Sequence, residues 1–345
     1  MDEDNFDPFD EDYAARDTVP RVHKPYVTQP AITQRKSRSF LSNFAFIGAR
    51  LVLIGKSLLV FAIILAYPAM AVMSHKVDDS RVRFDDSRYW AVPDLGVSAM
   101  LITRELDGPG WAGDRHPWHP QARLTALPAW QESLLAALAD HGRLIISELG
   151  DQRDQDLFAA VRLLEPSGEP NMTERLTAAN EALSRYNDRV AGGVTAAPMG
   201  VDAMQARLNL AAGWAEQNHD GLVAVASPGD GWIASEEAIR RVYAAKAAAH
   251  AAHEILAASA KHEQSLLTKY EADAAMQDVL NKWRRAASMR PLFVANQSGE
   301  ALSGLNHPAI MAFRLSEARL ATQTLSLRLQ EPPAPTGETD TPTTP

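Results

Sequence analysis

The chain has 345 residues, 46% of them hydrophobic, and a formal net charge of −9. Nucleic-acid-binding proteins need a basic surface to neutralise phosphates, so this acidic balance excludes a nucleic-acid partner. The sequence contains no cysteine, which excludes disulfides, thiol catalysis and cysteine-ligated metal sites.

Residues 1–38 are predicted to form a disordered, acidic, cytoplasmic tail. The first 17 residues contain eight acidic side chains and one basic side chain. Such a segment repels itself and buries little apolar surface. Phe6, Phe9 and Tyr13 lie among these acids, as in short peptides that dock onto a partner, but we favour a solvated tail.

Residues 44–75 are predicted to form a transmembrane anchor. The 19 residues from Ser57 to His75 contain no formally charged side chain. As a helix they would extend roughly 28 Å, close to the ~30 Å hydrocarbon core of a bilayer. Arg50 and Lys56 interrupt the apolar stretch upstream, and their long side chains are expected to reach the interface. A buried core helix is the alternative, but few core helices lie between a basic cluster and an acidic tail.

The charges around the anchor favour a cytoplasmic N-terminus. The positive-inside rule counts basic residues and gives little weight to acids. Five basic residues precede the apolar centre without an acid among them, whereas the four that follow are mixed with acids. We therefore expect the inner membrane of a bacterium, with the C-terminal domain in the periplasm. Ala69-Met70-Ala71 resembles a signal-peptidase site, but 56 residues precede the apolar stretch, so we expect an uncleaved anchor.

Residues 76–330 are predicted to form a mostly α-helical, bundle-like soluble domain. Pro93 is expected to open a helix, and Pro128 and Gly150 bracket another at 129–149. That helix has an apolar stripe spaced by four and seven residues, made of Leu134, Leu138, Ile145 and Leu149. Thr173 is the expected N-cap of a further helix that ends at Gly192, and another helix follows Pro198.

The C-terminal third is predicted to be helical as well. No glycine or proline occurs between Gly231 and Pro291, and the imperfect heptads there favour a bent helix or a helix pair over a coiled coil. A last helix runs from about Pro308 to Gln330, with Phe313, Leu320 and Leu327 seven residues apart. Only 222–226 and 292–295 resemble strands. Residues 331–345 are rich in proline and threonine and should form a disordered tail.

Glu105 is the candidate catalytic residue. It ends an apolar helix before a glycine-rich turn, an arrangement that resembles lytic transglycosylases, in which one buried carboxyl acts as acid and then base. The serine that usually follows is Leu106 in this chain. The neighbouring Arg104 would more naturally pair with a structural carboxylate, so we favour a structural role.

Trp111 and Trp118 are the candidate ligand-binding residues. Tryptophans beside prolines can form a flat platform for a carbohydrate or a peptide. More often such side chains cap a hydrophobic core where helices meet, and we favour that interpretation.

His250, His253 and Glu254 form the sequence HAAHE on one expected helix. This spacing is neither that of the zincins nor its inverse. We therefore predict no metal site. The chain has no Walker or Rossmann glycine pattern and no G-x-S-x-G motif, and we predict no cofactor.

Several segments together resemble the bacterial family catalogued as domain of unknown function 2333. The resemblance runs from about residue 44 to 330 and departs at 150–172, where the loop is shorter. It implies a single membrane anchor and a helical soluble part in Gram-negative bacteria, and it supplies no activity. The segments that carry it are 89–94, 101–105 with Gly110-Trp111, 185–189, and 291–296 with Asn306-His307.

These observations favour a non-enzymatic, inner-membrane-anchored helical scaffold or adaptor that faces the envelope and binds a protein partner. The alternative is a cell-wall-active glycan-binding protein or a lytic-transglycosylase-like enzyme that uses Glu105. A deep cleft at Glu105 would favour the enzyme, because a glycosidase requires a groove and a scaffold does not.

Overall fold

A continuous helix, α1 (Phe40–Ser74), carries the predicted anchor in the computed structural model. It contains one stretch, Ile47–Ala66, that is long and apolar enough to cross a membrane, and none of this stretch is buried. Its large apolar side chains are 49–66% exposed. Burying so many apolar side chains in lipid is favourable, whereas leaving them in water is not. The structure thus confirms one candidate membrane span.

The structure describes residues 40–74, 77–83, 89–116, 119, 125–150, 152–165, 171–226, 234–297 and 305–331. Both predicted tails, 1–38 and 331–345, lie outside these ranges apart from Glu331. Two compact units are distinguished, residues 1–59 and 60–345, and each is considered by itself.

The second unit contains a bundle of α-helices, which confirms the predicted fold class. No β-strand occurs in the described ranges, and Asn296 and Asn306 form one isolated bridge. The elements after α1 are α2 (Pro93–Asp107), η1 (Ala112–Asp114), α4 (Ala126–Leu149), α5 (Gln155–Leu164), α6 (Met172–Ala191), α7 (Gly200–Ala226), α8 (Glu236–His262), α9 (Gln264–Lys269), α10 (Asp273–Ala287) and α11 (His307–Arg328).

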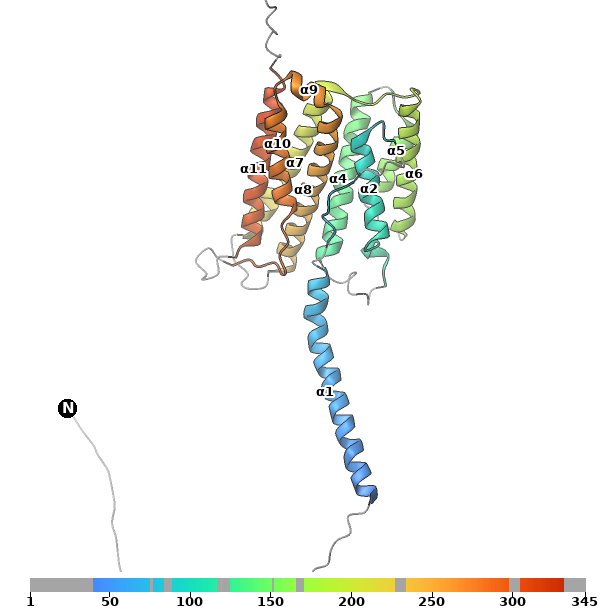
Figure 1. Ribbon diagram of the computed structural model, residues 1–345, viewed down its shortest axis with the longest axis vertical. Coiled ribbons are helices and arrows are strands. Elements are labelled where there is room, and N and C mark those ends of the chain that lie inside the picture. Colours follow the sequence, from blue (N-terminus) through green and yellow to red (C-terminus); the bar gives the residue numbers. More distant parts are fainter. Residues whose placement is uncertain are drawn as a thin grey trace, which may run out of the picture. The chain divides into compact units, whose positions relative to one another are not determined.

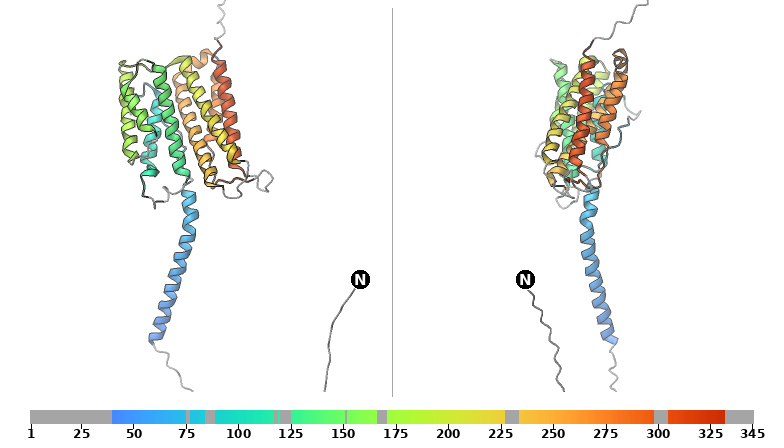
Figure 2. Two further views of the ribbon diagram at one scale, coloured as in Figure 1. Left: turned by 180° about the vertical axis from the view of Figure 1, so that it is seen from behind. Right: turned by 90° about the vertical axis from the view of Figure 1, so that its left-hand side faces the viewer.

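Helix α8 lies at the centre of the bundle. It packs against α2 and α4 on one side and against α7, α10 and α11 on the other. Figures 1 and 2 show α6 at one edge of the bundle and α11 at the opposite edge. From Ala245 to Leu256 every residue of α8 is buried. A helix that is buried on all sides needs small or apolar side chains all round, and the alanines of α8 supply them.

The long stretch without glycine or proline forms a helix pair, as predicted. Helix α8 ends at His262, and after the short α9 the chain returns as α10, which packs along α8. The turn between them has a left-handed residue, Glu271, with φ of 48°. A residue other than glycine seldom adopts this conformation, so the sequence did not locate the turn.

Helix α4 matches its prediction closely. Its stripe at Leu134, Leu138 and Ile145 is buried, and Gly150 follows the helix with φ of 57°. Helix α2 begins at Pro93 as expected. These boundaries were predictable because proline and glycine mark them.

Thr173 is not the N-cap of α6, contrary to the prediction. The helix begins at Met172, and Asn171 is the capping residue. Two free amides of the first turn are satisfied by Asp114 of η1, whose carboxylate accepts hydrogen bonds from the amides of Met172 (2.9 Å) and Thr173 (2.6 Å). The Thr173 hydroxyl donates to the same carboxylate at 2.6 Å. A carboxylate from another element therefore replaces the local cap.

The two strand-like segments do not form strands. Residues 222–226 are the last turn of α7, where Leu222 is buried. Residues 292–295 form neither a helix nor a strand. Short apolar runs do not distinguish a strand from a buried helix turn, which explains the error at 222–226.

Candidate functional site

Residues 77–83, which we call the strap, lie between α1 and α2 in the sequence and contact the bundle. The strap contains no helix, and it begins three positions after the last residue of α1. The carboxylate of Asp79 accepts from Lys246 Nζ at 2.8 Å and from Arg290 Nε at 3.0 Å. The Asp79 and Lys246 side chains are 3% and 2% exposed, whereas that of Arg290 is 70% exposed. The strap is thus held by a buried ion pair.

Two further polar contacts hold the strap. Arg104 of α2 donates to the carbonyl oxygen of Ser80 at 2.7 Å. The amide of Val82 donates to Glu254 Oε2 of α8 at 3.1 Å. The side chain of Val82 also packs against the hydrophobic core. Contacts from α2, α8 and the segment after α10 therefore order the strap.

The electrostatics of the strap favour an ionised Asp79. Burial alone would raise the pKa of Asp79, but hydrogen bonds from Arg290 and Lys246 lower it below its ordinary value. Burial lowers the pKa of Lys246, and its hydrogen bond with Asp79 opposes this. Lys246 Nζ also lies 5.7 Å from the centre of the Trp130 ring, where a cation is attracted to the ring face.

His250 and His253 are both buried on α8 and face different neighbours. Arg104 Nη2 lies 2.9 Å from His250 Nε2. A guanidinium only donates, so this nitrogen must accept and the imidazole is neutral. Burial and the charge of Arg104 lower the pKa of His250 to about 3. His253 Nδ1 donates to the carbonyl oxygen of Leu280 on α10 at 3.1 Å, and burial lowers its pKa to about 4.

Glu105 is buried, with 2% of its surface exposed. Its Oε1 accepts from Trp130 Nε1 and its Oε2 accepts from Gln131 Nε2, both at 3.0 Å. Both partners are donors, so each carboxyl oxygen of Glu105 accepts one hydrogen bond. Burial raises the pKa of Glu105, and the hydrogen bonds from Trp130 and Gln131 oppose this.

The expected ion pair between Arg104 and Glu105 does not form. Arg104 binds the strap and His250 instead, and neutral donors from α4 satisfy Glu105. Gln131 also donates to the carbonyl oxygen of Gly110 and accepts from the amide of Ala112, each at 2.9 Å. Glu105 and Gln131 therefore fix the glycine-rich turn after α2.

The two candidate tryptophans differ in what the structure says of them. Trp111 precedes η1 and is partly buried against the hydrophobic core, as expected of a core-capping side chain. Trp118 lies outside the described residues, so both the favoured core-capping role and the alternative as a platform stay predictions for it.

A second buried polar cluster joins four helices around Asp94, and sequence reasoning missed it. Arg207 of α7 forms an ion pair with Asp94 Oδ2 at 2.5 Å. His141 Nε2 of α4 lies 3.3 Å from the same oxygen, and Ser259 Oγ of α8 lies 3.5 Å from it. Burial alone would raise the pKa of Asp94, but Arg207 and His141 lower it far below its ordinary value. The signal in the sequence is Arg207, a charged residue on the otherwise apolar stripe of α7.

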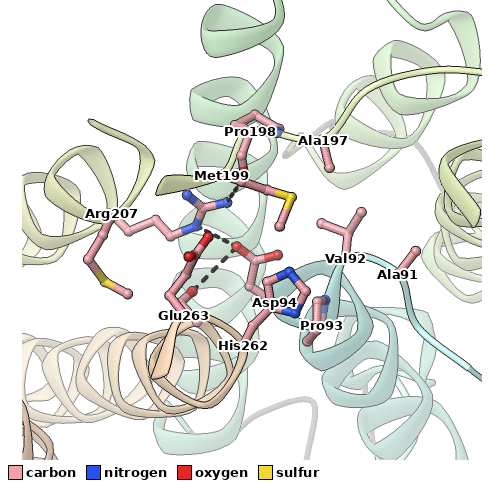
Figure 3. A pocket seen from close by; sticks show the side chains of 12 residues that line it. Ala91, Val92, Pro93, Asp94, Ala197, Pro198, Met199, Arg207, His262 and Glu263 are labelled. Carbon is pink, nitrogen blue, oxygen red and sulfur yellow. Dashed lines mark hydrogen bonds and ion pairs between the residues drawn. The ribbon is translucent and has the colours of Figure 1, made fainter. Parts of the chain in front are cut away.

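A small cavity of about 20 Å³ lies beside the Asp94 cluster. Figure 3 shows Asp94 and Arg207 facing each other there, with His262 and Glu263 nearby. This volume holds about one water molecule, which is too small for an organic substrate. Nearby Glu148 lies 3.9 Å from Arg207 Nη1, and burial raises its pKa to about 7.

An open groove of about 520 Å³ lies along α4 and α5. Its lining combines the apolar Phe158 with Arg143, Arg153 and Arg162. Arg143 is paired with Asp140 and with Glu165, which reduces the positive charge. Glu105 lines neither this groove nor the small cavity at Asp94.

Comparison with family models, with curated proteins and with solved structures finds no match for this chain. The resemblance to domain of unknown function 2333 therefore stays a hypothesis that rests on the segments named above.

Proposed function

We propose that this chain is a single-pass scaffold or adaptor of the bacterial inner membrane, with its helical domain in the periplasm and a protein as its partner. The observation that carries the proposal is the strap. An apolar helix, none of whose candidate membrane span is buried, is followed almost directly by a segment that a buried ion pair fixes to the bundle.

The form of this connection suits a scaffold. An enzyme that searches for substrates around its anchor is served by a flexible linker, which is rich in glycine and serine. The strap instead has a buried carboxylate and four polar contacts to the bundle. These contacts fix the segment that follows the apolar helix onto the bundle, which suits a surface presented to neighbours in the same membrane.

A cell-wall enzyme is the second candidate, and the raised pKa of Glu105 favours it. A general acid needs a pKa near the working pH. The hydrogen bonds argue against this role, because Trp130 and Gln131 occupy one oxygen each. A catalytic acid must present a proton to its substrate.

The variant Glu105→Gln distinguishes the two candidates. A glutamine side chain has one acceptor oxygen, so either Trp130 or Gln131 would face a donor. Leaving a buried donor unsatisfied costs roughly 1–3 kcal/mol. We expect a lower melting temperature, and no release of muropeptides from purified sacculi by either protein. The matched control is Glu132→Gln. Glu132 follows Gln131 on α4 and is exposed, so the same chemical change there should leave the melting temperature unchanged.

The same proteins test the scaffold directly. After detergent solubilisation and affinity purification, we expect one set of co-purifying proteins with the original chain and with both variants. Sacculus cleavage by the original chain that is lost in Glu105→Gln without loss of stability would establish the enzyme instead.

A further inference from the structure

The groove along α4 and α5 carries a charge opposite in sign to that of the whole chain. Three of its lining residues are arginines and one, Glu165, is an acid, whereas the chain has a formal net charge of −9. Arg143 is neutralised by its pairs with Asp140 and Glu165. Arg153 and Arg162 are exposed and form no ion pair with any residue in the described ranges. These two guanidinium groups therefore remain available to an anionic partner.

An aromatic side chain lies between these two arginines along α5. Phe158 lines the groove and is 44% exposed. It precedes Arg162 by four positions, so the two side chains share one face of the helix. Arg153 directly precedes Asp154, the N-cap of α5, and from Asp154 to Arg162 the chain rises about 12 Å at 1.5 Å per residue. The groove thus presents a cation near each end of α5 and an aromatic ring between the two.

Close packing of α4 on α5 fixes the base of the groove. Val161 lines the groove and is buried. A Cβ atom added to Gly142 of α4 would lie 2.5 Å from Val161 Cγ2, so the two helices approach this closely because Gly142 has no side chain. A surface that is already ordered loses little conformational entropy when a partner binds. The volume of about 520 Å³ is within the range of sites that hold a ligand.

We infer that this groove binds an extended acidic segment of a partner protein, with the pattern acid–x–apolar–x–acid. In an extended chain every second side chain lies on one face, and each residue rises about 3.3 Å. Two acids four positions apart are therefore about 13 Å apart, which matches the rise between Asp154 and Arg162. Their carboxylates pair with Arg153 and Arg162, since a guanidinium group donates two parallel hydrogen bonds to a carboxylate. The apolar side chain midway between the acids lies on Phe158.

The composition of the groove favours a protein segment over a free anion or a lipid. A free anion needs no apolar surface, yet Phe158, Ile146 and Val161 line the groove. An acyl chain needs a continuous apolar surface, which the arginines interrupt. Arginine and aromatic side chains together are typical of surfaces where proteins bind one another. The inference rests on the proposed function and deepens it, because it states the chemistry of the protein partner.

The first test varies the peptide and keeps the protein unchanged. The probe is the fluorescein-labelled peptide Gly-Asp-Ser-Phe-Ser-Asp-Gly, titrated with the full chain in a neutral detergent. We expect saturable binding by fluorescence anisotropy, weakened by added salt because salt screens exposed charges. Replacing both aspartates of the peptide by lysine should abolish binding, and replacing its phenylalanine by alanine should weaken binding several-fold.

The second test varies the groove. Arg153→Gln with Arg162→Gln should weaken binding of the peptide roughly tenfold, because two exposed ion pairs are lost. Both arginines are exposed, so neither change disturbs the core. The matched control is Arg285→Gln with Arg328→Gln. It removes the same charge from exposed positions on α10 and α11 and should leave the affinity unchanged. Phe158→Ala should weaken binding several-fold.

The outcomes separate this inference from the proposed function. Equal losses in the two double variants, or equal affinities for the phenylalanine and alanine peptides, would overturn the inference. Binding of short-chain phosphatidylglycerol in preference to the peptide, lost in Arg153→Gln with Arg162→Gln, would assign the groove to a lipid and also overturn it. If no peptide binds while proteins still co-purify with that variant, the groove inference fails and the scaffold stands. Peptide binding with no co-purifying protein would support the groove and contradict the scaffold.

Discussion

Asp79 shows how one buried charge fixes the strap to the bundle. Its carboxylate is as buried as that of a core residue, and its partners come from α8 and from Arg290, 211 positions away in the sequence. No pattern in the sequence predicts this contact, because an extended segment has no helical period and long-range charge pairs leave no local signal. The burial of Glu105 was easier to predict, because this residue lies at the end of an apolar helix.

The Asp79–Lys246 pair should show strong coupling between its two residues. Asp79→Asn leaves Lys246 buried without a countercharge, which we expect to cost about 3–5 kcal/mol of unfolding free energy. Lys246→Met should cost less, because Arg290 still pairs with Asp79. The double variant should be more stable than the sum of the two losses predicts, as measured by denaturant unfolding.

An exposed ion pair supplies the control for this measurement. Glu236 and Arg240 form an i,i+4 pair on the surface of α8, and Arg240→Met should cost less than about 1 kcal/mol. Strictly additive losses at Asp79 and Lys246 would contradict the coupling.

His250 should make the stability of the bundle depend on pH. Its folded-state pKa of about 3 lies below the ordinary value of 6.5, so the unfolded state binds more protons between these values. The contribution of His250 is therefore full above pH 6.5 and is lost as pH falls, by about 1.4 kcal/mol per unit. Glu148, with a pKa raised to about 7, acts in the opposite direction between pH 4.5 and 7.

The difference between the original chain and His250→Gln isolates this contribution, because Glu148 and His253 titrate in both proteins. A glutamine oxygen still accepts from Arg104. From pH 6.5 to 4.5 the stability of the original chain relative to the variant should fall by roughly 2 kcal/mol. Unfolding free energies that keep a constant difference over this range would show that the imidazole is not held neutral.

Elements with a regular apolar stripe were the predictable part of this fold. The stripes and the proline and glycine boundaries placed α2, α4 and α7 close to their observed positions. The stripe on α11 also has a regular period, but its seven-residue spacing marks the exposed face, and the buried face is made largely of smaller residues. Period alone therefore identifies a helix without showing which side is buried.

The anchor is the element whose role is tested most directly. Leu59 and Ile63 are exposed on α1, so replacing them does not disturb packing in the bundle. Leu59→Arg with Ile63→Arg should cost ~3 kcal/mol for each arginine near the centre of a membrane helix and release the chain from membranes. The measurement is the membrane fraction after an alkaline wash. The control, Leu59→Ala with Ile63→Ala, should stay bound, and retention of the arginine variant would place the span elsewhere.

For the whole molecule, the Asp94 cluster and the strap show what the sequence did not reveal. Asp94 meets Arg207, His141 and Ser259 only because α2, α7, α4 and α8 converge. A prediction of helices one by one does not include their mutual packing. The basic residues that determine orientation in a membrane differ from these buried charges. Their effect depends on how many lie on each side of the span, so it can be predicted without knowing how the helices pack.

Orientation is therefore the whole-molecule property that the sequence predicts and an experiment decides. Arg35, Lys36 and Arg38, together with Arg50 and Lys56, precede the apolar centre, and the basic residues after it are interspersed with acids. Since the rule depends on basic residues near the span, the end beyond Gln330 should be periplasmic. A reporter that is active only outside the cytoplasm should be active when fused there, and inactive when fused before Met1. The control is a cytoplasm-only reporter at the same two positions, which should give the reverse pattern. If that reporter is active after Gln330, the helical domain is cytoplasmic and the envelope-facing scaffold is excluded.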